Sequence, residues 1–279
     1  MFRRILIPLD PSPYTDAALE YGCLIAKQHD AEVTGLAILD IWAAEDAIPP
    51  ILYPGLHRAI QMQRYRKKSA RAHIDGLLHK FEQKCDQHGV SYQEFEHQGI
   101  PSKYILDESI FHDLVIVGCQ THFDFGGNQR PGRSLEQILD HAVTPILAVP
   151  DTFHWKEKPI KTLIAFNGSL PAVHTLQRFA NLARGGDYEI TLLMSDKDEQ
   201  VANFYLSRAE RYLHAHNFDN VKTVWTHKDI IFVIESEFID WADLVVAGAH
   251  SKKVLIDFMV GSVVKSLIKA AKKPIFLGQ

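Results

Sequence analysis

The sequence has few cysteines and no long apolar run. Its three cysteines, Cys23, Cys85 and Cys119, lie far apart and show no CxxC spacing. This is typical of a reducing compartment and not of a disulfide framework. No apolar run approaches the roughly 20 residues needed to span a bilayer, and the run at 5–9 is too short for the core of a signal peptide. A cytoplasmic protein without a membrane partner is therefore expected.

The sequence also lacks a strong excess of charge of either sign. The formal net charge is -4 and the pI is about 6.4. No overall positive field exists to hold a phosphate polymer, so nucleic acid is not expected as a partner. The 279 residues, 46% hydrophobic and 23% charged, suit a globular protein of two domains better than one of a single domain.

Familiar catalytic motifs are missing. The chain has no GxSxG elbow, no GxxxxGK[ST] P-loop, no HExxH and no GxGxxG after its first apolar run. No catalytic residue and no metal site are assigned. One alternative stays open, namely that His97, His112 and His122 converge near the carboxyl ends of strands in the first half.

What the sequence does contain is a repeat. The segment Ile5–Ser12 resembles Thr162–Ser169 at an offset of 157 residues, and the next apolar run follows at the same offset. Further along, Asp113–Gly118 resembles Asp243–Gly248 at an offset of 130 residues. The two halves therefore share an order of elements, and the first half carries about 27 extra residues, which we place near 41–63.

Short continuous apolar runs alternate with segments of helical length in both halves, which predicts βαβ units and buried parallel sheets. We expect an α/β protein of two tandem doubly wound domains, at 1–150 with the insertion near 41–63 and at 160–279. The second half is expected to repeat the elements of the first between 161 and 278. In the first half we expect strands at 4–9, 32–39, 91–97, 113–118 and 145–149, and helices at 14–28, 58–88, 101–110 and 133–142.

The clearest candidate site follows the fourth strand of the second half. Gly248-Ala249-His250-Ser251 ends that strand, and Gly261-Ser262 opens a helix after nine further residues. Ligands of open parallel sheets bind at the carboxyl ends of strands, where the strand order reverses. Small residues let the backbone approach a ligand, and a helix N-terminus offers free N–H groups to phosphate oxygens. Gly261-Ser262 could equally do no more than cap its helix.

With these segments, both halves resemble the universal stress protein family. The opening Ile5–Ser12 is similar to the family's first strand and turn, and the glycine-rich segment at 248–262 is similar to its ATP loop. Gly99-Ile100-Pro101-Ser102 resembles the turn before its third helix, and Leu135–Ala142 resembles its C-terminal helix. The resemblance implies five-stranded parallel sheets in the order 3-2-1-4-5, bound adenine nucleotide, and fifth strands that pair in a dimer, here within one chain.

The resemblance implies residues for a nucleotide site in each half. In the second half these are Ala165, Asn167, Met194, Ala247, Gly248, His250, Ser251, Gly261, Ser262 and Val263. The corresponding second site in the first half consists of Pro8, Asp10, Gly118, Thr121, Gly132 and Arg133. Asn167 and Ser251 depart from the family's acidic residue and second glycine, while Thr121 and Arg133 depart from its second glycine and its serine. Arg133 pairs with phosphate, fills an empty pocket or faces solvent.

The expected function is that of a stress-response regulatory protein that binds ATP or AMP, with or without Mg²⁺, in its C-terminal domain. The alternatives are a protein-interaction scaffold that has lost nucleotide binding and a weak ATPase. The expected assembly is an intramolecular pseudo-dimer through the fifth strands, with a homodimer as a further arrangement and an unidentified protein partner. The insertion near Trp42–Pro54 is either a strap over its own domain or a lid or docking patch.

Overall fold

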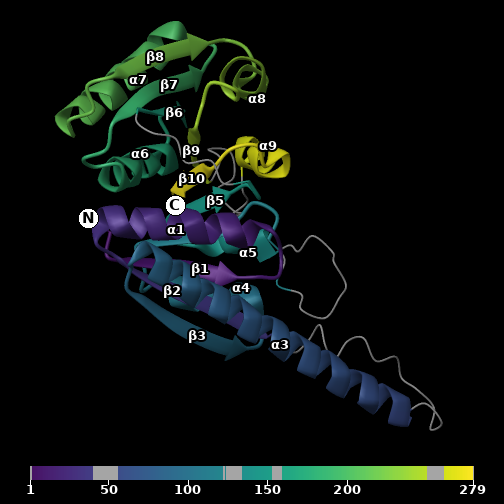
Figure 1. The fold of residues 1–279 in the computed structure, drawn as a ribbon. Coiled ribbons are helices and arrows are strands. Elements are labelled where there is room, and N and C mark those ends of the chain that lie inside the picture. The colour runs from purple at the N-terminus through teal and green to yellow at the C-terminus, as the bar shows by residue number, and fades with distance from the viewer. Residues whose placement is uncertain are drawn as a thin grey trace. The chain divides into compact units, whose positions relative to one another are not determined.

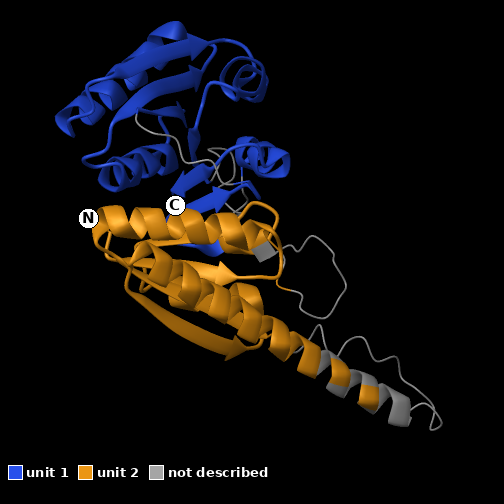
Figure 2. Cartoon of the chain, viewed as in Figure 1, with its two compact units in different colours: residues 1, 139–279 blue, residues 2–138 orange. Residues whose placement is uncertain are grey.

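The structure is a computed structural model that describes residues 2–39, 56–121, 123, 134–152, 159–249 and 261–278. The chain divides into two compact units (Figure 2). Unit 2 is Phe2–Ile138, and unit 1 is Leu139–Gln279 together with Met1. Most of the expected insertion at 41–63, including Trp42–Pro54, lies outside the described residues.

Unit 2 contains a four-stranded parallel sheet in the order β3-β2-β1-β4. Helices α1 and α3 pack against each other on one face, and α4 contacts β1 and β2 (Figure 1). The elements of the first half are β1 (Arg4–Leu9), α1 (Tyr14–His29), β2 (Glu32–Leu39), α3 (Leu56–His88), β3 (Tyr92–Gln98), α4 (Pro101–Ser109), β4 (Leu114–Gly118) and α5 (Ser134–His141).

Unit 1 contains strands in the order β5-β10-β9-β6-β7-β8, all parallel except β5, which is antiparallel to β10. Helices α6 and α7 contact each other, as do α8 and α9. The elements are β5 (Ile146–Val149), β6 (Ile160–Ala165), α6 (Leu170–Leu182), β7 (Tyr188–Ser195), α7 (Glu199–Ala215), β8 (Val221–Thr226), α8 (Ile230–Val233), the π-helical turn η2 (Ile234–Phe238), β9 (Leu244–Gly248), α9 (Ser262–Ala270) and β10 (Ile275–Gly278).

This architecture confirms the expected fold class, an α/β fold with mostly parallel strands flanked by helices. The expected ends of the first-half elements agree with the structure to within two residues, as for 58–88 against Leu56–His88. The compact units divide before β5 and not after it, because β5 pairs with β10 through Ala148 and Ile275. The division into domains at 1–150 and 160–279 stays a prediction.

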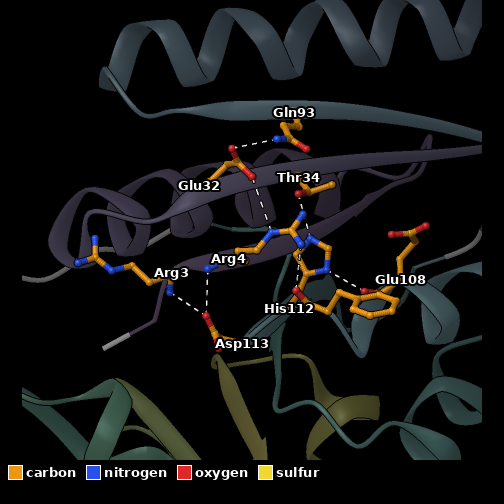
Figure 3. Close-up of polar contacts among 9 residues, drawn as sticks. Arg3, Arg4, Glu32, Thr34, Gln93, Glu108, His112 and Asp113 are labelled. Carbon is orange, nitrogen blue, oxygen red and sulfur yellow. Dashed lines mark hydrogen bonds and ion pairs between the residues drawn. The ribbon is translucent and has the colours of Figure 1, made fainter.

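The amino ends of corresponding strands are joined in the same way in both halves. The Oδ2 atom of Asp113 accepts hydrogen bonds from the backbone N–H of Arg3 (2.7 Å) and Arg4 (3.0 Å), as Figure 3 shows. In unit 1, Asp243 Oδ2 accepts from the backbone N–H of Lys161 at 3.1 Å. Each aspartate also donates its own N–H to a carbonyl of the neighbouring strand, Arg4 or Lys161. The register between the two central strands is thereby fixed at their amino ends.

The amino edge of unit 2 carries further polar contacts across its strands (Figure 3). Arg4 Nε lies 3.7 Å from Glu32 Oε1, and Glu32 Oε2 accepts a hydrogen bond of 3.1 Å from Gln93 Nε2. These partners come from β1, β2 and β3 in turn. Because the pairs are largely solvent-exposed, we expect them to favour the register and to add little stability.

The core of unit 2 depends on one glycine of β2. A Cβ atom at Gly35 would lie 2.8 Å from the ring of Phe81, which is fully buried on α3. Glycine at this position therefore lets the long helix approach the sheet. Beside this contact the Sγ atoms of Cys23 and Cys85 lie 4.0 Å apart between α1 and α3. Cys119 is buried too, so all three cysteines are buried.

The core of unit 1 is built around Phe179. Its ring centroid lies 5.7 Å from Tyr188, 6.1 Å from Phe218 and 6.2 Å from Phe276, distances typical of interacting aromatic rings. Burial raises the pKa of Tyr188 to about 12. Within the described residues, no helix has the length and apolar character needed to cross a membrane.

A buried histidine connects α4, β4 and β2 in unit 2. His112 Nδ1 lies 2.8 Å from the carbonyl oxygen of Glu108, to which it donates (Figure 3). In the neutral ring Nε2 then accepts from the Thr34 hydroxyl at 2.9 Å. Burial is the main cause that lowers the pKa of His112 below 6.5, and Arg4 adds to it. The Glu108 hydrogen bond and the Glu108 and Asp113 carboxylates act in the opposite direction.

This geometry predicts that acid destabilises the fold through His112. Because the pKa of the folded state lies below that of the unfolded chain, the unfolded chain binds more protons between the two values. The free energy of unfolding should therefore fall as the pH drops below about 6.5 and gain nothing further from this group above it. Urea unfolding at about pH 7.5 and about pH 5.5 measures the effect. A weaker pH dependence is expected in His112→Gln, and an unchanged one would contradict the prediction.

Candidate functional site

A cavity of about 230 Å³ lies at the carboxyl ends of the strands in unit 1. It lies where the strand order reverses between β6 and β9, which is where open parallel sheets bind ligands. Segments after β6, β7, β8 and β9 all contribute to its wall. The lining residues are Ala165, Phe166, Asn167, Ser169, Ala172, Ser195, Asp229, Ile230, Ala247, Gly248, Gly261, Ser262, Val263 and Val264.

Asn167 forms the turn that follows β6. Its Oδ1 atom accepts hydrogen bonds from the backbone N–H of Ser169 (3.0 Å) and from the Ser169 hydroxyl (2.6 Å). The Ser169 Oγ atom in turn accepts from the Ala172 N–H at 3.4 Å and caps α6. This is the compact turn that asparagine and serine favour before a helix. It holds the exposed Asn167 amide at the wall of the cavity.

Gly248 ends β9 directly against the start of α6. A Cβ atom here would lie 3.2 Å from the Ala172 nitrogen and 3.3 Å from the Pro171 carbonyl carbon. The absence of a side chain thus brings the strand end and the helix start close together. Packing alone accounts for glycine at this position, and a ligand that approaches the same backbone would gain from it as well.

Helix α9 opens toward the cavity. Its N-cap is Gly261, which provides no side-chain cap, and the first backbone bond within the helix runs from Lys265 N to Gly261 O at 3.0 Å. The N–H groups of Ser262, Val263 and Val264 precede that bond and have no partner within the helix. All three residues line the cavity. Free N–H groups and the positive end of the helix dipole are suited to an anion.

The opposite end of the cavity has a different chemistry. Ser195 lies at the end of β7, Asp229 is the N-cap of α8, and Ile230 is the first residue of that helix. The reasoning from sequence missed Ser195 and Asp229. The available signal was the spacing in Asp229-Ile230-Ile231, where an aspartate before an apolar helix is typical of an N-cap. That signal indicates the helix start but not that the side chain borders a cavity.

The structure brings most of the expected second-half residues together. Those that line the cavity are Ala165, Asn167, Ala247, Gly248, Gly261, Ser262 and Val263. Met194 does not, because it is buried in β7 with 1% of its surface exposed, and the next residue, Ser195, faces the cavity instead. His250 and Ser251 lie outside the described residues.

A comparison with protein-family models matches residues 1–150 to the Universal stress protein family. The chain belongs to the universal stress protein family. No curated protein matches the chain in sequence. Among solved structures, a universal stress protein from Archaeoglobus fulgidus is similar, with 17% sequence identity, a TM-score of 0.69, and coverage of 99% of this chain and 98% of its own. A functionally unknown protein from Pseudomonas aeruginosa has 14% identity, a TM-score of 0.61 and coverage of 99% and 92%.

In the first half, which carries the family match, the turn after β1 is more deeply buried than the corresponding turn of the second half. Asp10 is 1% exposed, and its Oδ1 atom accepts from the hydroxyls of Ser12 (2.7 Å) and Thr15 (2.6 Å). Asn167, at the corresponding position of the second half, is exposed. The acidic residue typical of the family is thus present in the first half, but its carboxylate is buried within its own turn.

Tyr14, at the start of α1, packs directly against Gly118 at the end of β4. A Cβ atom at Gly118 would overlap the Cβ of Tyr14, and it would lie 2.9 Å from the first carbon of the ring. Pro171, which has no such ring, is the corresponding residue of the second half. Gly118 therefore packs against the start of α1, as Gly248 packs against the start of α6.

The remaining first-half residues are placed as follows. Pro8 is buried and pairs with Leu36 of β2, while the pairing of β1 with β4 covers only Ile5 and Leu6. A proline without a donor is tolerated where that pairing has ended. Thr121 is 2% exposed, and its hydroxyl has no hydrogen-bond partner within the described part of the chain. Gly132 and Arg133 lie outside the described residues.

Of the three histidines whose convergence the sequence leaves open, His122 lies outside the described residues. His112 lies before β4, at the amino edge, and bonds to Thr34. His97 Nε2 lies 3.4 Å from Glu108 Oε1. In the described part of the chain, no three His, Cys, Asp or Glu side chains form a group that could hold a metal ion.

Gly118 and Gly248, the glycines that end β4 and β9, are packed differently. An added methyl group should therefore lower the free energy of unfolding by different amounts at the two positions. We expect Gly118→Ala to lower the free energy of unfolding by about 1–3 kcal/mol, because the added methyl overlaps Tyr14. Gly248→Ala should cost less, since its nearest contacts of 3.2–3.4 Å need only a small shift. Urea unfolding compares the two. Gly76→Ala is the control, because Gly76 has open space around it and alanine favours a helix. Equal costs for both variants would contradict the prediction.

Proposed function

We propose that this protein binds an adenine nucleotide, ATP or AMP, in the cavity of its second half and acts as a regulatory member of the universal stress protein family. The observation that carries the proposal is the position of that cavity. It lies at the reversal of strand order, and seven of the residues expected from the sequence line it together. Family membership by itself would not be sufficient, because a fold does not fix a function.

The wall of the cavity offers partners for each part of a nucleotide. The free N–H groups at the start of α9 suit a phosphate group. The Asn167 amide lies at the wall after β6, where it can hydrogen-bond to a ribose. The volume of about 230 Å³ is below the roughly 300–1,000 Å³ of pockets that enclose a whole drug-sized ligand. We therefore expect the base and ribose to be held inside and the outer phosphates, with or without Mg²⁺, to extend past α9.

The first half supports the proposal by contrast. Its Asp10 carboxylate is buried and accepts two hydroxyl groups, and Tyr14 packs against Gly118. A nucleotide there would have to displace both arrangements. We propose that the first-half residues Pro8, Asp10, Gly118, Thr121, Gly132 and Arg133 do not form a second working site.

The assembly that we propose is a cytoplasmic pseudo-dimer in which the fifth strands of the two repeats pair. Its support is the antiparallel ladder of Ile146–Ala148 with Ile275–Leu277. Bound nucleotide would then alter the surface formed by α8 and α9, the helices that border the cavity. A protein partner would read that surface.

The test is to measure nucleotide binding to the purified full chain. Mass spectrometry of small molecules released on denaturation, followed by calorimetric titration with ATP-Mg and AMP, should find about one adenine nucleotide per chain. Gly261→Glu should abolish it, because the new side chain enters the cavity and its charge repels phosphate. Gly76→Glu is the matched control, since it adds the same charge to an exposed position with open space on α3.

The outcomes of this test distinguish the proposed second-half site from an interaction scaffold and from a nucleotide site elsewhere. Binding that is lost in Gly261→Glu and kept in Gly76→Glu supports the second-half site. An empty wild-type protein that also fails to bind added nucleotide overturns the proposal and favours the interaction scaffold. Binding that persists in Gly261→Glu would place the nucleotide elsewhere and overturn the assignment of the site.

A further inference from the structure

The end of the cavity opposite α9 presents hydrogen-bond acceptors. Asp229 caps the short helix α8, and its Oδ1 atom accepts from the N–H groups of Ile231 (2.9 Å) and Phe232 (3.1 Å). Both bonds go to the same oxygen. Oδ2 therefore keeps its capacity to accept a hydrogen bond, while Oδ1 is occupied by two donors.

The position of this carboxylate is fixed from two sides. The two cap bonds orient the side chain, and the preceding residue, Lys228, is held through its backbone. The Lys228 carbonyl accepts from the Ser195 hydroxyl at 2.7 Å, and the Lys228 N–H donates to Thr226 Oγ1 at 3.1 Å. Because the Ser195 proton is used in this bond, the Ser195 oxygen can act toward the cavity only as an acceptor.

The two ends of the cavity belong to one connected wall. Helix α9 lies beside α8, and the Ser266 hydroxyl of α9 donates to Glu235 of the π-helical turn η2 at 2.8 Å. Between the strands that lead to these ends, β9 and β8, lie β6 and β7. The carboxyl ends of β9 and β8 are therefore three strand intervals apart, about 14 Å.

The cavity thus has N–H donors at α9 and hydrogen-bond acceptors at Ser195 and Asp229, and this arrangement determines which ligands it can recognise. An anion at the free N–H groups of α9 places the base of a nucleotide toward Ser195 and Asp229. A base edge that donates a hydrogen bond is favoured there, because both side chains offer lone pairs. A hydrogen bond to a charged carboxylate contributes more than one between neutral groups.

We propose that Asp229 determines base specificity by accepting a hydrogen bond from the 6-amino group of adenine through Oδ2. The inference rests on the proposed function and deepens it, since it names the residue that distinguishes adenine from a purine without that amine.

The test compares AMP with purine riboside 5′-monophosphate, which differs from AMP in having hydrogen in place of the amine. Calorimetric titration of the wild-type full chain should give AMP an affinity at least about tenfold higher. In Asp229→Asn the cap oxygen is retained, while the group that faces the cavity becomes an NH₂ donor. The affinity for AMP should fall about tenfold, and the preference for AMP should disappear.

Asp198→Asn is the matched control. Asp198 caps α7 in the same way, accepting from Gln200 N (2.8 Å) and Val201 N (3.3 Å), and it does not line the cavity. This variant should bind both ligands like the wild type. Thermal melting of both variants should show that the asparagine caps are tolerated, and a binding change in Asp229→Asn alone is then not a folding defect.

Four results would overturn the inference. If the wild type binds both ligands equally, or if Asp229→Asn keeps the preference for AMP, Asp229 does not read the amine while nucleotide binding itself stands. Tighter binding of GMP than of AMP to the wild type would assign the carboxylate to the donor edge of guanine instead. Failure of the wild type to bind any of these ligands overturns the proposed function and this inference with it.

Discussion

The positions of the residues at the carboxyl ends of the sheet depend, in each half, on the pairing of its two central strands. In unit 1, β6 and β9 pair in a register that places Thr162 opposite Leu244 and Ala165 opposite Ala247. Asp243 fixes this register by bonding to the Lys161 N–H at the amino end. A slip by one residue would turn every side chain to the other face of the sheet. The cavity is at the carboxyl end, so its geometry depends on a bond at the opposite edge.

The two repeats share this strand pairing and differ in the turn residues that follow the strands. Asp113 repeats the role of Asp243, yet the crevices above these strands differ in two turn residues. Tyr14 fills space in the first half where the second half has Pro171, and a buried Asp10 corresponds to an exposed Asn167. Both changes lie where the first strand of a repeat leads into its first helix, and the order of strands and helices is the same in the two repeats. The arrangement of the sheet is thus determined by strand pairing, whereas the residues available to a ligand are determined by the turns and loops after the strands.

Much of the fold could be predicted from sequence because its elements follow periodicity. The continuous apolar runs gave the strands, and the extent of the long helix was found within two residues, Leu56–His88 against 58–88. The site was harder, because lining a cavity depends on tertiary packing. Met194 and Ser195 are neighbours on β7 and point to opposite sides, and only the structure shows that Ser195 borders the cavity. Likewise, sequence indicates Asp229 as a cap, and only the folded sheet brings it opposite α9.

The polarity of the cavity explains how a chain of net charge -4 can select an anionic ligand. The overall charge acts at long range and is screened by salt, whereas the N–H groups of α9 act at contact distance. At the other end the Asp229 carboxylate disfavours an anion, so a phosphate group is attracted to one end only. A ligand with an anion at one end and a hydrogen-bond donor at the other satisfies both ends at once. A free phosphate ion would satisfy only one, so the proposed ligand, a nucleotide, would be favoured over free phosphate.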